Sequence, residues 1–227
     1  MLKDELTIVI PCKNEEKTVR DIITKCQKYS DDIIVIDGHS TDKTREIAES
    51  MNARVYLDNK KGKGDGIRVG ISKALRNIIV FIDADGSHNP DEIPRLVQPI
   101  IDGKADHVTG SRGRGGSDEL HGDFGKFMRM IGSDIIVLGI NYRFGVRLTD
   151  SQNGFRAIKR EVAQSLDLKE NITTIEQEMI IKTLRKGYRM SEVPSHEYAR
   201  EYGNSSVKLG KVWFRYIYSW LKYLLWG

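Results

Sequence analysis

Five apolar residues run directly into a pair of carboxylates in the stretch Ile78-Ile79-Val80-Phe81-Ile82-Asp83-Ala84-Asp85-Gly86-Ser87-His88. A run this short and this apolar predicts a strand covered on both faces, which is typical of a parallel sheet. Gly86 and the following Asn89-Pro90 end the strand, so Asp83 and Asp85 stand at its carboxyl end. Open α/β sheets bind their ligands at that end.

Asp83 and Asp85 are two positions apart, and in a strand such side chains point to the same side. Two carboxylates at one point suit a hard divalent cation, which usually keeps substrate phosphates as further ligands. An Asp-x-Asp pair taken alone is more often a solvated turn. An EF-hand calcium loop is excluded, because His88 and Pro94 stand where that loop requires Gly and Glu.

The composition is that of a soluble body. The 227 residues are 30% charged and 39% hydrophobic, enough for one domain with a sizeable core and a short appendage. The formal net charge of +4 does not indicate nucleic-acid binding. Cys12 and Cys26 form no disulfide framework and no metal spacing, which predicts a reducing compartment. We expect no signal peptide and no run of the ~20 apolar residues that span a membrane.

Strands and helices alternate along the first half of the chain. Strands are expected at 6–10, 33–36, 55–57, 78–82 and near 107–109, with helices of apolar periodicity between them. This alternation predicts a parallel, doubly wound sheet. The first strand leads into the sequence PCKNE instead of Gly-x-Gly-x-x-Gly, which argues against a nicotinamide dehydrogenase. A nucleotidyltransferase would also place a glycine-rich loop there.

Four motifs occur in order along this framework: IPCKNE at 10–15, VIDGHSTD at 35–42, DADGSHNPDEIP at 83–94 and GSR at 110–112. Together they resemble the family 2 glycosyltransferases of the GT-A fold. The closest subgroup includes dolichol-phosphate mannose synthase, which loads sugar onto polyprenyl phosphate. The features that extend the match to this subgroup are Asp150, NGFR at 153–156, Glu176, Glu178 and Arg200.

The resemblance covers about residues 6–206. It implies an α/β catalytic domain of the GT-A, Rossmann-like type over 1–206, with a mostly parallel sheet flanked by helices. The remaining residues, 207–227, are expected to form a C-terminal amphipathic helix.

The resemblance also assigns the acidic stretch. Transfer from a nucleotide sugar releases a nucleoside diphosphate, whose developing charge a divalent cation can stabilise. Asp85 is implied as the main ligand of Mg²⁺ or Mn²⁺, and Asp83 as a contact of the metal or of the donor ribose. Ser87, a weaker oxygen ligand, stands where some relatives have Gln. His88 is expected to be structural.

Other implied residues hold the donor. Pro11, Glu15 and Asp37 lie at the ends of the first two strands, where carboxylates accept from base N–H groups and ribose hydroxyls. Many relatives carry Asp-Asp where this chain has Asp37-Gly38, so the carboxylate that reads the base stays open. Asp42 is expected to act as a helix cap or first-turn charge. Lys63, in a glycine-flanked loop, either reaches the donor or lies on a solvated surface.

The expected acceptor is itself an anion. A phosphate monoester, with a second pKa near ~6, needs cations to hold it and no general base. Arg112, Arg129 and Arg200 fit this need, because guanidinium groups pair bidentately with phosphate oxygens. Glu176 and Glu178 either orient these arginines or are first-turn helix carboxylates. Direct displacement by the acceptor phosphate predicts inversion at the anomeric carbon.

The end of the chain, Lys208–Gly227, departs from a soluble profile. At helical spacing its polar residues cluster on one arc, surrounded by aromatic and aliphatic side chains. This pattern predicts a helix lying in a membrane interface. Packing on the domain or on a second subunit is the alternative, and loss of spans that some relatives possess is a third. The polar residues are Lys208, Lys211, Arg215, Ser219 and Lys222.

The sequence therefore predicts a metal-dependent, inverting glycosyltransferase, peripheral on the cytoplasmic face of the cell membrane. GDP-mannose is the first expected donor, followed by UDP-glucose or UDP-N-acetylglucosamine, and polyprenyl or dolichyl phosphate is the expected acceptor. Two alternatives stay open: transfer to a glycan hydroxyl, and a non-catalytic membrane scaffold that binds a nucleotide sugar. The oligomeric state is not indicated.

Overall fold

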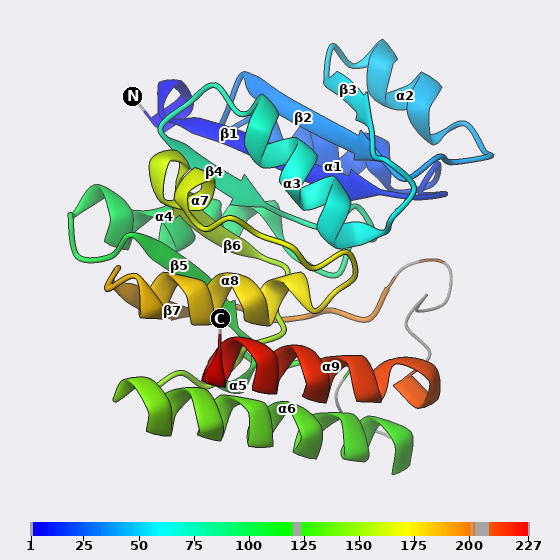
Figure 1. Cartoon of the computed structure of the whole chain (residues 1–227). Coiled ribbons are helices and arrows are strands. Elements are labelled where there is room, and N and C mark those ends of the chain that lie inside the picture. The colour runs from blue at the N-terminus through cyan, green and yellow to red at the C-terminus, as the bar shows by residue number, and fades with distance from the viewer. Residues whose placement is uncertain (1, 120–123, 201, 203–208, 227) are drawn as a thin grey trace.

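A computed structural model describes residues 2–119, 124–200, 202 and 209–226, with the side chains of 2, 124–127, 129 and 209–212 left out of the description. Its described part is built on one seven-stranded sheet of order β3-β2-β1-β4-β6-β5-β7, flanked by helices (Figure 1). The strands are β1 (Leu6–Cys12), β2 (Asp32–Asp37), β3 (Arg54–Leu57), β4 (Ile78–Phe81), β5 (His107–Ser111), β6 (Arg156–Lys159) and β7 (Met190–Pro194).

Most strand pairs are parallel, as the sequence predicts. The neighbouring pairs β3-β2, β2-β1 and β1-β4 are all parallel, and so is β5-β7. Strand β6 alone runs antiparallel to its neighbours β4 and β5. The mostly parallel sheet with flanking helices is therefore confirmed.

Helices follow the strands in the expected alternation through the first half, and further helices complete the second half. They are α1 (Val19–Cys26), α2 (Thr44–Ser50), α3 (Lys63–Lys73), α4 (Ile93–Ile101), α5 (Arg112–Gly115), α6 (Phe124–Phe144), α7 (Arg160–Ser165), α8 (Ile175–Arg185) and α9 (Leu209–Leu225), with short 3₁₀ turns η1 (Leu2–Asp4) and η2 (Pro90–Glu92).

Helix α2 begins at Thr44, and Asp42 lies two residues before it. Its first N–H, that of Thr44, donates to the carboxylate of Asp42 at 3.0 Å. Asp42 also accepts from the N–H of Glu16 at 3.2 Å, which links the helix to the end of β1. The N-cap position itself is Lys43, whose side chain makes no capping hydrogen bond, so Asp42 acts from the residue before it on the first N–H of the helix.

Alternate residues of the central strands enter two separate cores. On β1, Ile8 and Ile10 pack into the core beneath α1 and α4, while Val9 packs into the opposite core beneath α3 and α8. All three side chains are fully buried. A strand with both faces covered needs apolar residues at every position, which explains why these strands appear as continuous apolar runs.

Helix α9 lies alongside α8 and α6 (Figure 1). Tyr223 and Leu224 of α9 are buried in a third cluster with Ile136 and Ile140 of α6. Ser219, expected on an outward polar arc, is also buried, at 1% exposure. The expected polar arc is thus wrong at this position, because α9 uses that side to pack on the protein. No helix within the described ranges combines the length and apolar character required to span a membrane.

Candidate active site

A cavity of about 1080 Å³ opens at the carboxyl ends of β1 to β4 and the amino end of α3. The parallel strand order brings together residues that are far apart in the sequence, as expected for this edge of an α/β sheet. Six of the predicted site residues line the cavity: Pro11, Glu15, Lys63, Asp83, Asp85 and Arg200.

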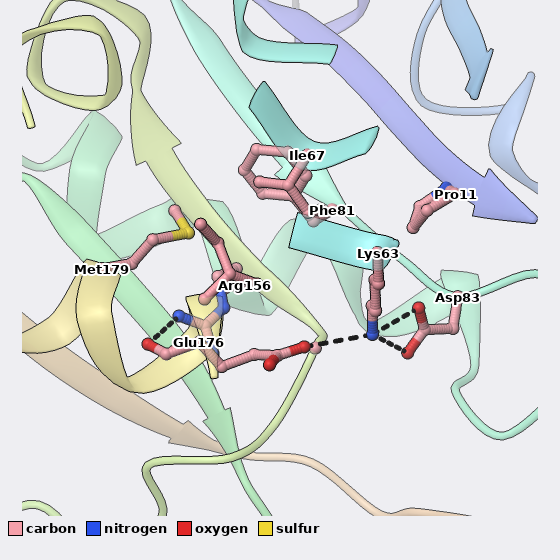
Figure 2. Close-up of a pocket in the computed structure, with 10 residues that line it drawn as sticks. Pro11, Lys63, Ile67, Phe81, Asp83, Arg156, Glu176 and Met179 are labelled. Carbon is pink, nitrogen blue, oxygen red and sulfur yellow. Dashed lines mark hydrogen bonds and ion pairs between the residues drawn. The ribbon is translucent and has the colours of Figure 1, made fainter. Parts of the chain in front are cut away.

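Lys63 joins two carboxylates beside the cavity (Figure 2). Its Nζ lies 2.8 Å from Oδ1 and 2.9 Å from Oδ2 of Asp83, and 3.1 Å from Oε1 of Glu176. The Lys63 and Asp83 side chains keep 24% of their surface exposed, whereas the Glu176 side chain keeps 5%. Lys63 is thus a site residue and not a solvated surface charge.

The glycines around Lys63 explain its position. Gly62 precedes the first residue of α3 with φ of +113°, a conformation that favours glycine. A Cβ on Gly154 would lie 2.7 Å from Oδ2 of Asp83 and 3.0 Å from Nζ of Lys63. The NGFR motif therefore contributes an empty space in which the Lys63–Asp83 ion pair forms.

The charges of this group are coupled. Burial raises the pKa of Asp83, but the nearby Lys63 ammonium outweighs it, so that the pKa of Asp83 falls below its usual value. Burial lowers the pKa of Lys63, and its two carboxylate neighbours reverse this effect and raise it. Burial raises the pKa of Glu176 despite the opposing effect of Lys63. The stable arrangement at neutral pH is an ammonium shared between two acids.

Asp85 has different partners. Its Oδ2 lies 3.1 Å from Nη2 of Arg200, and its Oδ1 accepts from the hydroxyl of Ser87 at 2.6 Å and from the N–H of Ser87 at 3.1 Å. Glu15 lies across the cavity, where burial, and next the charge of Asp85, raise its pKa. Ser87 does not line the cavity; it orients the Asp85 carboxylate.

The two aspartates have the chemistry of a shared Mg²⁺ or Mn²⁺ site. Mg²⁺ in proteins is commonly held by one or two carboxylates together with substrate phosphates, and Asp83 and Asp85 both reach the cavity. Within the described residues, no group of three or more His, Cys, Asp or Glu side chains is placed to hold a metal ion. The donor set therefore fits a cation whose remaining ligands are waters or the phosphates of a bound diphosphate.

Asp37 lies outside the cavity lining. Its side chain is fully buried and accepts from Nε and Nη2 of Arg45 at 3.0 and 2.9 Å. Asp58, just after β3, lines the cavity instead. Sequence reasoning missed Asp58, although it follows an expected strand in the same way as Asp83. Tyr202 also lines the cavity, with Nζ of Lys17 4.8 Å from its ring centre.

Arg112 is paired with two acidic side chains outside the cavity lining. Its Nε and Nη2 donate to the two oxygens of Asp150 at 2.6 and 2.9 Å, and its Nη1 lies 3.3 Å from Glu197. Burial alone would lower the pKa of Arg112, but the neighbouring Asp150 has the larger effect and raises it. Burial alone would raise the pKa of Asp150, but Arg112 has the larger effect and lowers it. Arg112 does not line the cavity. Arg129 belongs to α6, and its side chain lies outside the described residues.

The other predicted acids and His88 are structural or supporting. Glu178 accepts from the N–H groups of Lys169 and Glu170 and pairs with Lys182 at 2.8 Å. His88 is buried, and its ring stacks on Phe155 with centroids 5.4 Å apart. Neither residue lines the cavity.

The profile described as "Glycosyl transferase family 2" matches residues 7–167, which include the strands and the acidic stretch that form the cavity. The chain belongs to glycosyl transferase family 2. The family resemblance that the motifs indicated is thereby confirmed.

The chain is also similar in sequence to proteins that are named as glycosyltransferases. Glycosyltransferase AglJ from Haloferax volcanii is 30% identical over 208 residues, which cover 89% of this chain and 66% of that protein. A UDP-N-acetylglucosamine--dolichyl-phosphate N-acetylglucosaminyltransferase from Methanococcus voltae is 27% identical, with 92% of this chain and 93% of that protein covered.

Among solved structures, glucosyl-3-phosphoglycerate synthase from Mycobacterium tuberculosis, in complex with Mn²⁺ and UDP-glucose, has a TM-score of 0.77. It is 22% identical, and the match covers 97% of this chain and 79% of that one. This likeness confirms the fold of the family 2 glycosyltransferase described here.

Proposed function

We propose that this glycosyltransferase moves one sugar from a nucleoside-diphosphate sugar to a polyprenyl phosphate, with inversion at the anomeric carbon. The observation that carries the proposal is the charge arrangement of the cavity, where Asp83 and Asp85 each contact a cationic side chain that also reaches the open space. The cavity thus combines two carboxylates suited to a metal-bound diphosphate with two cationic side chains suited to phosphate groups.

The donor diphosphate would lie at Asp83, Asp85 and Lys63. Asp83 and Asp85 would hold Mg²⁺ or Mn²⁺, which would supply positive charge against the charge that develops on the leaving diphosphate. Lys63, at the first turn of α3, adds an ammonium, and helix amino ends favour anions. Pro11 and Glu15 at the end of β1, with Asp58 beyond β3, surround the remaining space for the nucleoside.

The acceptor phosphate would bind at Arg200. Arg200 lines the cavity with its side chain 31% exposed, whereas Arg112 is already paired with Asp150 and Glu197. An ionised phosphate needs no proton removed before it attacks the anomeric carbon, so direct displacement with inversion follows. The name of the M. voltae relative, which contains dolichyl phosphate, supports this class of acceptor.

The proposed location is the cytoplasmic face of the cell membrane, where a lipid phosphate is accessible. Large apolar side chains of α6 and α9 are exposed on the protein surface, and aromatic residues favour the membrane interface. The exposed side chains that support this placement are Met128, Ile135, Leu138 and Tyr142 of α6 and Trp213, Phe214, Ile217, Tyr218, Leu221 and Leu225 of α9.

The donor identity is part of the proposal. GDP-mannose, UDP-glucose and UDP-N-acetylglucosamine differ in base and sugar, and the two UDP donors have support from the names of a relative and of a structural neighbour. The direct test supplies each radiolabelled donor with Mn²⁺ and a short polyprenyl phosphate. Label is expected in the lipid extract for one donor, with the anomeric configuration inverted.

Three outcomes would contradict the proposal. Label that enters only added oligosaccharides would indicate transfer to a glycan hydroxyl. Donor binding by calorimetry without turnover on any lipid phosphate would indicate a non-catalytic binder. A lipid product that keeps the donor configuration would exclude the direct displacement.

A further inference from the structure

Lys63 is surrounded by carboxylate oxygens in the structure. An ammonium group has three N–H donors and no acceptor. The three carboxylate oxygens around Nζ, two from Asp83 and one from Glu176, lie at 2.8, 2.9 and 3.1 Å (Figure 2). In this arrangement the Lys63 ammonium is directed at two carboxylates and not at the open space where a phosphate would bind.

A divalent cation and Lys63 compete for Asp83. Both oxygens of the Asp83 carboxylate contact Nζ, so a cation on Asp83 would lie next to an ammonium of the same sign. The backbone at Gly154 closes one side of the pair, because a Cβ there would lie 2.7 Å from Oδ2 of Asp83 and 3.0 Å from Nζ of Lys63. Binding of a cation at Asp83 therefore requires Lys63 to move.

Glu176 is placed to keep Lys63 near the cavity after this movement. It is 4% exposed, and its carbonyl accepts from Nη1 of Arg156 at 3.0 Å, which fixes the start of α8. Its Oε2 has no hydrogen-bond partner among the described side chains and backbone groups. The carboxylate borders a small space of about 10 Å³ shared with Lys63, Asp83 and Gly154. Glu176 can thus accept a second N–H from Lys63.

We propose that Glu176 is a positioning residue: it retains Lys63 when a divalent cation displaces the ammonium from Asp83, and so directs the freed N–H groups to the donor diphosphate. Lys63 then passes between two states, one paired with Asp83 and one binding phosphate. This inference rests on the proposed function, since it takes the donor to be a nucleoside diphosphate sugar.

The test measures Mn²⁺ binding in the absence of nucleotide, by the electron paramagnetic resonance signal of free Mn²⁺. Lys63→Gln removes the competing charge and is expected to tighten Mn²⁺ binding about tenfold. Glu176→Gln leaves Asp83 as the only charged partner of Lys63, and is expected to weaken Mn²⁺ binding about threefold or more. In a Lys63→Gln background, Glu176→Gln is expected to have no effect on Mn²⁺ affinity.

A second titration adds UDP or GDP at saturating Mn²⁺. Glu176→Gln is expected to weaken nucleotide binding only when Lys63 is present. The matched control is Glu161→Gln, because Glu161 is an exposed glutamate on α7, and this variant should match the wild type in both titrations. Thermal unfolding of every variant confirms that it is folded.

The outcomes separate the two proposals. Equal effects of Glu176→Gln in both backgrounds, or no effect in either, would overturn the positioning role, because a merely structural glutamate does not depend on Lys63. If the wild-type protein binds Mn²⁺ but neither nucleotide, the proposed function fails instead. These readouts require no sugar transfer, so a missing acceptor cannot be mistaken for either result.

Discussion

Gly154 and Asp83 approach so closely that a methyl group on Gly154 would lie 2.7 Å from the carboxylate oxygen Oδ2. The two residues come from different parts of the chain, the loop before β6 and the end of β4. Their contact explains why the NGFR motif belongs to the site although its glycine has no functional group. The Lys63–Asp83 ion pair requires that no side chain is present at position 154.

The first prediction concerns this space. Gly154→Ala should displace Asp83 or Lys63, and a displacement near 1 Å lowers turnover by roughly 100-fold. The backbone of Gly154 does not have a positive φ, so alanine introduces a steric effect without backbone strain. Steady-state transfer rates check the loss of activity, and urea unfolding checks that the fold remains stable.

The control for Gly154→Ala is Gly132→Ala on α6. A Cβ at Gly132 would have no atom within 4 Å, and alanine favours a helix over glycine by about 1 kcal/mol. This variant should keep full activity and equal or greater stability. Similar activity losses in both variants would show that the close contact with Asp83 is not the cause.

The second prediction concerns Asp85. Asp85→Asn keeps the shape and the contacts with Ser87 but removes the negative charge that faces Arg200 and the cavity. Turnover should fall by about 10² to 10³, the range found when one electrostatic contact to the transition state is lost. Mn²⁺ affinity should fall in parallel. Undiminished transfer would remove Asp85 from the mechanism; Asp91→Asn, on the exposed surface at η2, is the matched control.

The third prediction separates two arginines. Arg112→Ala leaves Asp150 buried without its guanidinium, and breaking such a pair costs about 3 kcal/mol or more of unfolding free energy. Arg200→Ala removes a partly exposed side chain, and Asp85 keeps its two hydrogen bonds from Ser87, so it should lower activity and cost less stability than Arg112→Ala. Urea unfolding and the acceptor KM measure the two effects.

The opposite pattern would contradict these assignments. If Arg112→Ala keeps its stability and loses only acceptor affinity, then Arg112 must leave Asp150 to bind the phosphate. If Arg200→Ala keeps the wild-type acceptor KM, the acceptor site lies elsewhere. Arg114→Ala, in the same short helix as Arg112 and more exposed, is the control for the helix itself.

The sequence predicted the parts of the fold that depend on local pattern. The expected strands from β1 to β5 are all present. Of these, β1, β2 and β4 are short apolar runs with both faces covered, whereas β3 is a half-buried edge strand. Strand β6 was not predicted, because its four residues begin with Arg156, which is buried at 1% exposure. A charged residue inside a sheet is paired by contacts from elsewhere in the chain, here the carbonyls of Asn153 and Glu176.

The sequence predicted those residues of the cavity that directly follow a predicted strand. Asp83 and Asp85 follow an apolar strand and reach the cavity, whereas Asp37 follows another and does not. The difference is Arg45, the second residue of α2, which pairs with the Asp37 carboxylate. Motifs alone cannot show which acid already has a partner, because that depends on side chains brought in by neighbouring elements.

The fourth prediction is a loss of stability at mildly acidic pH. His107 is fully buried, and burial, followed by the charge of Arg156, holds its pKa well below 6.5. The unfolded chain therefore binds a proton near pH 6.5 that the folded chain does not. Stability is fully present above that pH and falls as the pH is lowered, by at most about 1.4 kcal/mol per pH unit.

His107→Gln isolates this contribution. Glutamine can keep a hydrogen bond like that between Nδ1 and the hydroxyl of Thr183, now 3.0 Å, and it does not titrate. Urea unfolding of both proteins from pH 7.5 to 5 should give curves whose difference narrows as the pH falls. A constant difference would show that His107 does not set the pH dependence. His196, half-buried and paired with Asp118, supplies the control position.

The fifth prediction tests the membrane surface. Deletion of residues 208–227 is a poor test, because it also removes Tyr223 and Leu224 from their buried cluster. Substitution of Phe214, Tyr218 and Leu225 by serine changes only side chains that are more than half exposed. Sedimentation with anionic liposomes should fall at least tenfold, because binding scales with the apolar area buried in the interface.

The stability and the Mn²⁺ affinity of the triple variant should match those of the wild type. The unfolding free energy should change by less than about 1 kcal/mol, since exposed substitutions are usually close to neutral, and Mn²⁺ affinity should match the wild type. Leu75→Ser, at an exposed leucine outside α9, should leave liposome binding intact. Equal sedimentation of the triple variant and the wild type would show that the exposed side of α9 does not contact lipid. The exposed apolar side chains of α6 would then be the next to substitute.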